Sequence, residues 1–388
     1  MKLIHFFIFG LCLTMFSCED KPLVIAEEET PTLPTVPYDY KTLNLPIGTQ
    51  AAGIIFTDFE IINGIPVFTN SSMGITNEGA SLGRVLFYDK KLSLNNTVSC
   101  GTCHHQDKGF ADGKQFSTGF EGRVTTRNSM SIANPITQNN LFWDSRSKTI
   151  HDLSLQPVQN HIEMGMENLD RLVEKLENTE YYKPLFAAAY GNSEVTPEKI
   201  SIALSQFVGS ITTNRSKLDI GMQEGFSNFT ELEIMGRELF HSDRAKCSSC
   251  HGGNNFSALD GPSDPYGGGG GGSASSDLRG AANIGLDLVY ADNGFGDGKF
   301  KIPGLRNVEL TAPYMHDGRF NTLEEVVNHY SEGIKPHKAL DVKFTDGKGN
   351  VKPLHLNSIE KKALVAFLKT LTDKEMAANP KWSNPFKK

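Results

Sequence analysis

The chain has 388 residues, of which 38% are apolar, and its formal net charge is −7. This length allows two or three domains of ordinary size, and the apolar content is sufficient for a real core. The negative charge argues against nucleic acid as a partner, because nucleic acid binding requires a basic surface.

Residues 1–18 have the pattern of a targeting segment. Lys2 gives a positive start, and residues 3–16 are mostly apolar but too few to span a bilayer. The pair Ser17–Cys18 resembles a bacterial lipoprotein processing site, which would make Cys18 the lipidated first residue. Ordinary secretion with cleavage nearby is the alternative. Both alternatives predict export to the periplasm, and the first adds a membrane anchor.

Residues 19–45 have a composition typical of a linker. Four prolines are spread among threonine and glutamate (Pro22, Pro31, Pro34 and Pro37). Such a segment is expected to be an extended tether without a core of its own. The folded body is therefore predicted to begin near residue 46.

The most informative motif is a Cys-x-x-Cys-His run that occurs twice. The cysteines are Cys100 with Cys103, and Cys247 with Cys250. Two thiols one helical turn apart can attach a haem through its vinyl groups, and the histidine that follows (His104 or His251) can ligate the iron. A zinc site is the alternative, but zinc ribbons place their cysteine pairs about 15–20 residues apart. These pairs lie in different halves of the chain, so the motifs predict two covalent c-type haems.

The sequence around each run is also repeated. Residues 82–87 and 235–240 share the pattern Gly-Arg-x-Leu-Phe, and each segment is expected to form a helix before its run. After the runs, the order Arg-Asn, Pro, Asp-x-Arg, Thr-aliphatic recurs. The repeat predicts a mainly α fold with two cytochrome c-like domains related by internal duplication, spanning residues 46–225 and 226–388.

Three further segments have helical signals. Residues 169–176 carry an apolar stripe, and Thr196–Pro197 begins a second helix with apolar positions up to Ile211. A last helix is expected from Asn357, where Glu360 completes a capping box. We expect this last helix to pack on the one before Cys247.

From about Pro46 onward, the chain resembles the bacterial di-haem cytochrome c peroxidases and their relative, the methylamine-utilisation di-haem enzyme MauG. The resemblance rests on the two haem runs and on four further blocks: Arg127-Asn128, 142–146, 157–164 and 305–318. It implies a peroxidatic haem in the N-terminal domain and an electron-transfer haem in the C-terminal domain.

The resemblance also implies roles for individual residues. Glu163 would lie on the distal side of the first haem and carry a proton between the two peroxide oxygens. Trp143 would lie between the haems and pass electrons. Asn128 and the backbone carbonyls of Thr311 and Pro313 would bind calcium.

Two positions depart from the classical members of this family. Phe120 stands where a loop histidine blocks the first haem, so we expect this haem to be open to peroxide without prior reduction. Tyr330 stands where a methionine ligates the second haem, and MauG also has tyrosine there. Phenolate favours ferric iron. Met315 and His329 are rival ligands, and Met315 would restore a high-potential haem.

The leading hypothesis is a cytochrome c peroxidase that reduces hydrogen peroxide with electrons from a small protein such as cytochrome c or a cupredoxin. The alternatives are a MauG-like enzyme that oxidises residues of a protein substrate, and a pure di-haem electron carrier. The expected cofactors are two c-type haems and calcium. A homodimer is left open, and no nucleic acid partner is expected.

Overall fold

The computed structural model describes residues 29–46, 59–62, 65–68, 74–138, 140–258 and 280–386. The targeting segment 1–18 and the first part of the expected tether lie outside these residues. From Pro31 onward the chain forms one compact unit. Within the described residues, no helix is long and apolar enough to cross a membrane.

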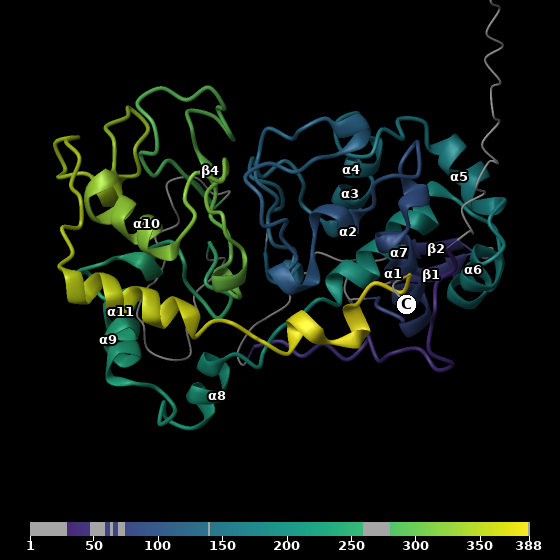
Figure 1. Ribbon diagram of the computed structural model, residues 1–388, viewed down its shortest axis with the longest axis horizontal. Coiled ribbons are helices and arrows are strands. Elements are labelled where there is room, and N and C mark those ends of the chain that lie inside the picture. Colours follow the sequence, from purple (N-terminus) through teal and green to yellow (C-terminus); the bar gives the residue numbers. More distant parts are fainter. Residues whose placement is uncertain are drawn as a thin grey trace, which may run out of the picture. The chain divides into compact units, whose positions relative to one another are not determined.

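Short helices joined by loops form most of the described structure (Figure 1). The α-helices are α1 (Asn77–Tyr88), α2 (Cys100–Cys103), α3 (Ile150–Ser154), α4 (Gln156–Gln159), α5 (Leu169–Glu177), α6 (Tyr182–Tyr190), α7 (Pro197–Gly209), α8 (Lys217–Gln223), α9 (Glu231–His241), α10 (Leu323–Asn328) and α11 (Ser358–Lys369). The described strands form two antiparallel pairs, β1 (Phe59–Ile62) with β2 (Ile65–Phe68) and β3 (Ala281–Ala282) with β4 (Phe300–Lys301). Helical content is moderate, at 40%, and the described residues contain no large sheet.

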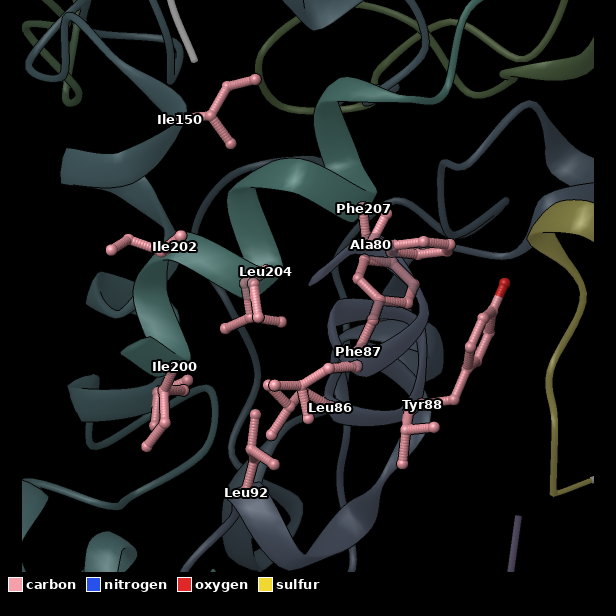
Figure 2. Close-up of a cluster of buried hydrophobic side chains, with 14 of the residues drawn as sticks. Ala80, Leu86, Phe87, Tyr88, Leu92, Ile150, Ile200, Ile202, Leu204 and Phe207 are labelled. Atoms are coloured by element: carbon pink, nitrogen blue, oxygen red, sulfur yellow. The ribbon is translucent and has the colours of Figure 1, made fainter. Parts of the chain in front are cut away.

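The first core forms where α1 crosses α7. A Cβ atom on Gly83 would lie only 1.9 Å from the carbonyl oxygen of Ala203, so the absence of a side chain permits the close approach. Phe87 of α1 and Phe207 of α7 point toward one another, with ring centroids 5.2 Å apart (Figure 2). This core fixes the helix that leads toward Cys100.

The second core repeats the same crossing with α9 and α11. A Cβ on Gly236 would lie 1.9 Å from the carbonyl oxygen of Ala363. The rings of Phe240 and Phe367 are 5.2 Å apart. Thr230 and Asn357 each form a capping box at the start of these helices, and the box at Asn357 confirms the prediction from the sequence. The expected packing of the last helix on the helix before Cys247 is therefore confirmed.

The recurring Asp-x-Arg blocks form turns of the same shape. Residues 141–147 and 314–320 are each closed by an antiparallel bridge between their end residues. Each turn has its second residue in the left-handed region, Phe142 at φ 64° and Met315 at φ 74°. A helix capped by threonine follows both turns, with Thr149 before α3 and Thr322 before α10. The repeated sequence order thus corresponds to a repeated local structure.

The chain after α11 returns to the first core. Met376 and Trp382 are buried there, and the Tyr88 hydroxyl donates to the carbonyl oxygen of Trp382 at 2.7 Å. Figure 1 shows this last segment running from α11 to the side of the molecule that contains α1. Residues 226–388 therefore do not pack as a separate domain over their whole length, contrary to the boundary expected from the sequence.

The expectation of a free tether over residues 19–45 is wrong for the described end of this segment. Tyr40 is completely buried, its ring lies 6.3 Å from that of Phe207, and its hydroxyl donates to the carbonyl oxygen of Lys381. The Thr32 N–H donates to the carbonyl oxygen of Pro385. Prolines gave this segment the composition of a linker, but its tyrosine and leucine side chains are anchored in the first core.

Candidate haem sites and the cavity beside them

The first Cys-x-x-Cys run forms the single turn of α2, which brings Cys100 and Cys103 onto one side of the chain. Gly101 lies against the ring of Tyr88, where an added Cβ would be 2.4 Å from a ring carbon. His104 donates from Nδ1 to the carbonyl oxygen of Phe110 at 2.8 Å. Because this bond uses Nδ1, Nε2 is the nitrogen left to ligate a metal.

The second run presents the same donors. Nδ1 of His251 lies 3.1 Å from the carbonyl oxygens of both Phe256 and Pro303, so Nε2 is again the available nitrogen. Burial lowers the pKa of His251 to about 4. The imidazole is therefore neutral near pH 7, as a metal ligand must be.

A cavity opens beside the second run. It is lined by Cys247, Cys250 and His251 and is otherwise mostly apolar, with side chains from α9, α10 and α11. Two thiols, an imidazole with a free Nε2 and an apolar wall form the donor set that a covalent haem requires. The residues present fit haem at this site, and the first run offers the same thiols and imidazole.

Glu163 lies close to the first pair of thiols. Burial raises the pKa of Glu163, and the charge of Arg146 opposes this shift. Burial also raises the pKa of Cys100 to about 12 and that of Cys103 to about 11, and the negative charge of Glu163 contributes to both shifts. The carboxyl group and the two thiols therefore share one environment.

A tight turn holds Glu163 in this position. Its N–H donates to Oδ1 of Asn160, and the N–H of Phe120 donates to its carbonyl oxygen at 2.9 Å. A Cβ on Gly119 would lie 2.2 Å from the carbonyl oxygen of Ile162, so the loop before Phe120 packs tightly against this turn. The loop before Phe120 and the turn at Glu163 are therefore packed together, and these hydrogen bonds fix the backbone from which the Glu163 side chain extends.

Phe120 itself is buried against the Glu163 turn. A Cβ on Gly165 would lie 2.7 Å from its ring, and Arg123 lies over the ring at 5.5 Å from its centroid. Arg123 also donates to the carbonyl oxygen of His161. These contacts attach the loop to the turn.

Tyr330 occupies the second site on a π-helical turn, His329–Gly333, that continues α10. Such turns are rare and often occur at functional sites. Tyr330 lines the cavity, and burial together with the nearby thiols of Cys250 and Cys247 raises its pKa. Met315 also lines the cavity. His329 instead donates from Nε2 to the carbonyl oxygen of Ile284 at 2.9 Å, which leaves Tyr330 and Met315 as the candidate distal ligands.

Comparisons with known proteins agree with this geometry. The family model for di-haem cytochrome c peroxidase matches residues 77–225. The cytochrome c551 peroxidase of Nitrosomonas europaea is 30% identical over 299 residues, which cover 76% of this chain and 79% of that protein. The chain belongs to the di-haem cytochrome c peroxidase family. This membership assigns the protein to the oxidoreductases and implies two c-type haems.

Relatives named MauG match as well as those named peroxidase. The methylamine utilization protein MauG of Methylophilus methylotrophus is 28% identical over 298 residues, covering 76% of this chain and 83% of that protein. The crystal structure of a MauG-like protein associated with microbial copper homeostasis aligns with a TM-score of 0.69 and 32% identity, covering 89% of this chain and 99% of that one. The comparisons therefore establish the family, and they include both relatives named peroxidase and relatives named MauG.

In this di-haem family member, Trp143 lies at the contact between the two halves. Its indole N–H donates to the carbonyl oxygen of Asn128 at 2.9 Å, and its own carbonyl oxygen accepts from the N–H of Lys301 at 2.8 Å. Trp143 lines the cavity of the second run. The hydroxyl of Ser129 donates to the carbonyl oxygen of Cys103 and lies 3.5 Å from Nδ1 of His104. A short path of peptide and hydrogen bonds thus joins Trp143 to the first site.

The three residues expected to bind calcium line the same cavity. These are Asn128, Thr311 and Pro313. The side-chain amide of Asn128 donates to the carbonyl oxygens of Lys114 and Gln115, and its N–H donates to that of His316. All three residues line one cavity, and the calcium site at these residues stays a prediction.

Arg127 belongs to one of the blocks that carry the family resemblance, but the sequence motifs did not reveal its partners. It forms ion pairs with Asp144 in the first half and with Asp292 in the second, at 2.7 and 2.6 Å. The hydrogen bond from Arg127 lowers the pKa of Asp292. The repeated Arg-Asn order gives Arg127 a counterpart in Arg306. Asp292 lies in a loop outside the repeated blocks, so no sequence signal connected Arg127 with Asp292.

Proposed function

We propose that this protein is a peroxidase that reduces hydrogen peroxide to two water molecules, taking two electrons from a small redox protein and two protons. Family membership supports the reaction class. The observation that carries the proposal is Glu163, a carboxyl group with a raised pKa beside Cys100 and Cys103. Haem bound at these thiols would supply the iron at which peroxide is reduced.

The residues of the first site have distinct tasks in this proposal. One carboxylate oxygen of Glu163 accepts the proton from one peroxide oxygen and returns it to the other, which leaves as water. The burial that raises the pKa of Glu163 makes its carboxylate a stronger base. Arg146 opposes that shift and so keeps the group ionisable. Phe120 leaves the distal side without a histidine ligand, so no reductive activation is required.

Trp143 is proposed as the electron relay between the halves. An indole can lose and regain an electron. The indole N–H of Trp143 donates to the carbonyl oxygen of Asn128, and the backbone carbonyl oxygen of Trp143 accepts from the N–H of Lys301. The C-terminal half would store and deliver electrons through the haem held by His251. The duplication of the domains, calcium at Asn128, Thr311 and Pro313, export, anchoring through Cys18 and a homodimer belong to the same proposal.

Steady-state kinetics with the haem-loaded protein test this function. Hydrogen peroxide should be consumed with two equivalents of reduced cytochrome c oxidised per peroxide, and the fully oxidised protein should turn over without a lag. A preparation with two haems per chain and no peroxide-dependent oxidation of cytochrome c or cupredoxin would overturn the proposal.

A second candidate is a MauG-like enzyme that oxidises residues of a protein substrate. Tyr330, buried beside the second pair of thiols, favours it, because a phenolate ligand favours high oxidation states of iron. Adding peroxide to the oxidised protein without any donor distinguishes the two. A state oxidised at both irons that persists for minutes supports the second candidate, and rapid return to the resting spectrum supports the first.

A further inference from the structure

The side chain of Lys301, a buried lysine that lines the second cavity, has no role in the proposed function. Lys301 is only 5% exposed, although lysine is among the residues least often buried without a charged partner. Its ammonium group is hydrogen-bonded to the side-chain oxygen of Gln138. Among the described residues, no carboxylate forms an ion pair with it.

The wall around Lys301 is built for an anion. None of the residues that line the cavity is aspartate or glutamate. Burial, with no compensating negative charge, lowers the pKa of Lys301 to about 7. Asn255 also lines this cavity and is buried, and its side-chain nitrogen has no acceptor among the described residues. Buried donors without partners normally have a ligand or water to satisfy them.

The position of Lys301 indicates which anion it binds. Lys301 and the proximal histidine His251 line the same cavity, and Nδ1 of His251 lies 3.1 Å from the carbonyl oxygen of Pro303, two positions after Lys301. The same cavity contains Cys247 and Cys250. A haem attached to these thiols would bring two propionate carboxylates, which are the anionic groups of an otherwise apolar macrocycle.

We propose that Lys301, assisted by Gln138, binds a propionate carboxylate of the haem that is attached to Cys247 and Cys250. The amide nitrogen of Gln138 or of Asn255 can donate to the remaining carboxylate oxygens. The backbone N–H of Lys301 donates to the carbonyl oxygen of Trp143, so Lys301 lies at the contact between the two halves. Gln138 comes from the first half, so both halves contribute to holding the second haem.

The substitution Lys301→Met tests this assignment, because it keeps the length of the side chain and removes its charge. A nearby cation disfavours ferric iron, so its loss should lower the reduction potential of the His251 haem. The potential of each haem is measured by redox titration monitored by electron paramagnetic resonance. The propionate bending band in the resonance Raman spectrum should also shift. An unchanged potential and band in protein with two haems per chain would overturn the proposal.

Lys199→Met is the matched control. Lys199 is equally buried, but it lies in the first half and is paired with Glu194. Its removal should leave the potential of the His251 haem unchanged. If Lys301→Met prevents haem attachment, Lys301→Arg should restore both attachment and potential, because arginine keeps the charge. Failure of Lys301→Arg to restore either would count against a carboxylate partner.

The inference rests on the second haem of the proposed function, and the two can fail separately. A parent protein with fewer than two haems per chain would refute the di-haem function itself. A fully loaded parent protein in which Lys301→Met leaves the potential and the Raman band unchanged would refute only the role of Lys301.

Discussion

The first half of the molecule holds Glu163 on a tight turn beside its thiols, whereas the second half holds Tyr330 on a π-helical turn beside its own. The helix crossings in the two halves are alike, since α1 crosses α7 at Gly83 as α9 crosses α11 at Gly236. The difference arises after the capping threonines. In the first half α4 and a turn follow α3, whereas in the second half the π-helical turn continues α10 directly. In the proposed function, the shared scaffold would hold the histidine of each run, and the segment that follows would set the chemistry of each site.

The largest effect is expected from removing the acid beside the first pair of thiols. Glu163→Gln should lower peroxide turnover by about 10²–10⁴-fold, because the variant cannot carry the proton between the two oxygens. Turnover in the parent should also fall as the pH decreases through the raised pKa of Glu163, above its ordinary value of 4.5. This acid limb should be absent from the residual activity of the variant.

Glu167→Gln is the matched control, since Glu167 is an exposed acid four positions further along the chain. It should leave turnover and the pH profile unchanged. Equal losses in both variants would show that the turn, and not the carboxylate of Glu163, matters.

The shared helix crossings can be broken one at a time. Gly83→Ala and Gly236→Ala each force a Cβ to within 1.9 Å of a carbonyl oxygen, and each should reduce the free energy of unfolding by about 1–3 kcal/mol. Denaturant unfolding monitored at each haem measures the effect. If the halves are as alike as their geometry indicates, the two losses should agree to within about 1 kcal/mol.

Replacing each of the two candidates in turn can identify the distal ligand of the second haem. Tyr330→Phe should change the ferric spectrum and raise the potential of the His251 haem, because phenolate stabilises ferric iron. Met315→Leu should leave both unchanged. The opposite pattern in the spectra and redox titrations would assign the ligand to Met315.

The smallest effect concerns the ion pairs that join the halves. Arg127→Gln should reduce stability by no more than about 1 kcal/mol, because Arg127 and Asp292 are partly exposed to solvent. Asp292 has a lowered pKa in the folded protein, so its contribution is fully present above its ordinary pKa of 3.8 and is lost as the pH falls through the lowered, folded-state pKa. Urea unfolding at pH 7 and pH 3 should show a smaller difference between the variant and the parent at pH 3. Lys183→Gln, which removes an exposed pair with Glu180, should have no measurable effect at either pH.

Local signals predicted the repeated parts of the fold well. The capping boxes at Thr230 and Asn357 and the shared Gly-Arg-x-Leu-Phe pattern depend on neighbouring residues, so they can be read directly from the sequence. Each haem run likewise contains its two thiols and its histidine within five residues. The expected packing of the last helix followed from the repeat.

Long-range packing could not be predicted in the same way. Tyr40 lies in a segment rich in proline, and nothing nearby in the sequence indicates that Phe207 and Lys381 will enclose it. Lys301 occurs between apolar residues, but its burial becomes apparent only when Gln138 and the second cavity are brought together. Such contacts depend on the complete fold, and composition reports only the average surroundings of a segment.

The return of the chain to the first core has a consequence for the order of folding. Trp382 and Met376 complete the surroundings of Tyr88, and Gln106, just after the first haem run, donates to the carbonyl oxygens of Met376 and Asn379. These residues follow both haem runs in the sequence. The first core is therefore completed only by residues from the end of the chain, and it cannot close around Tyr88 before both haem runs have been synthesised.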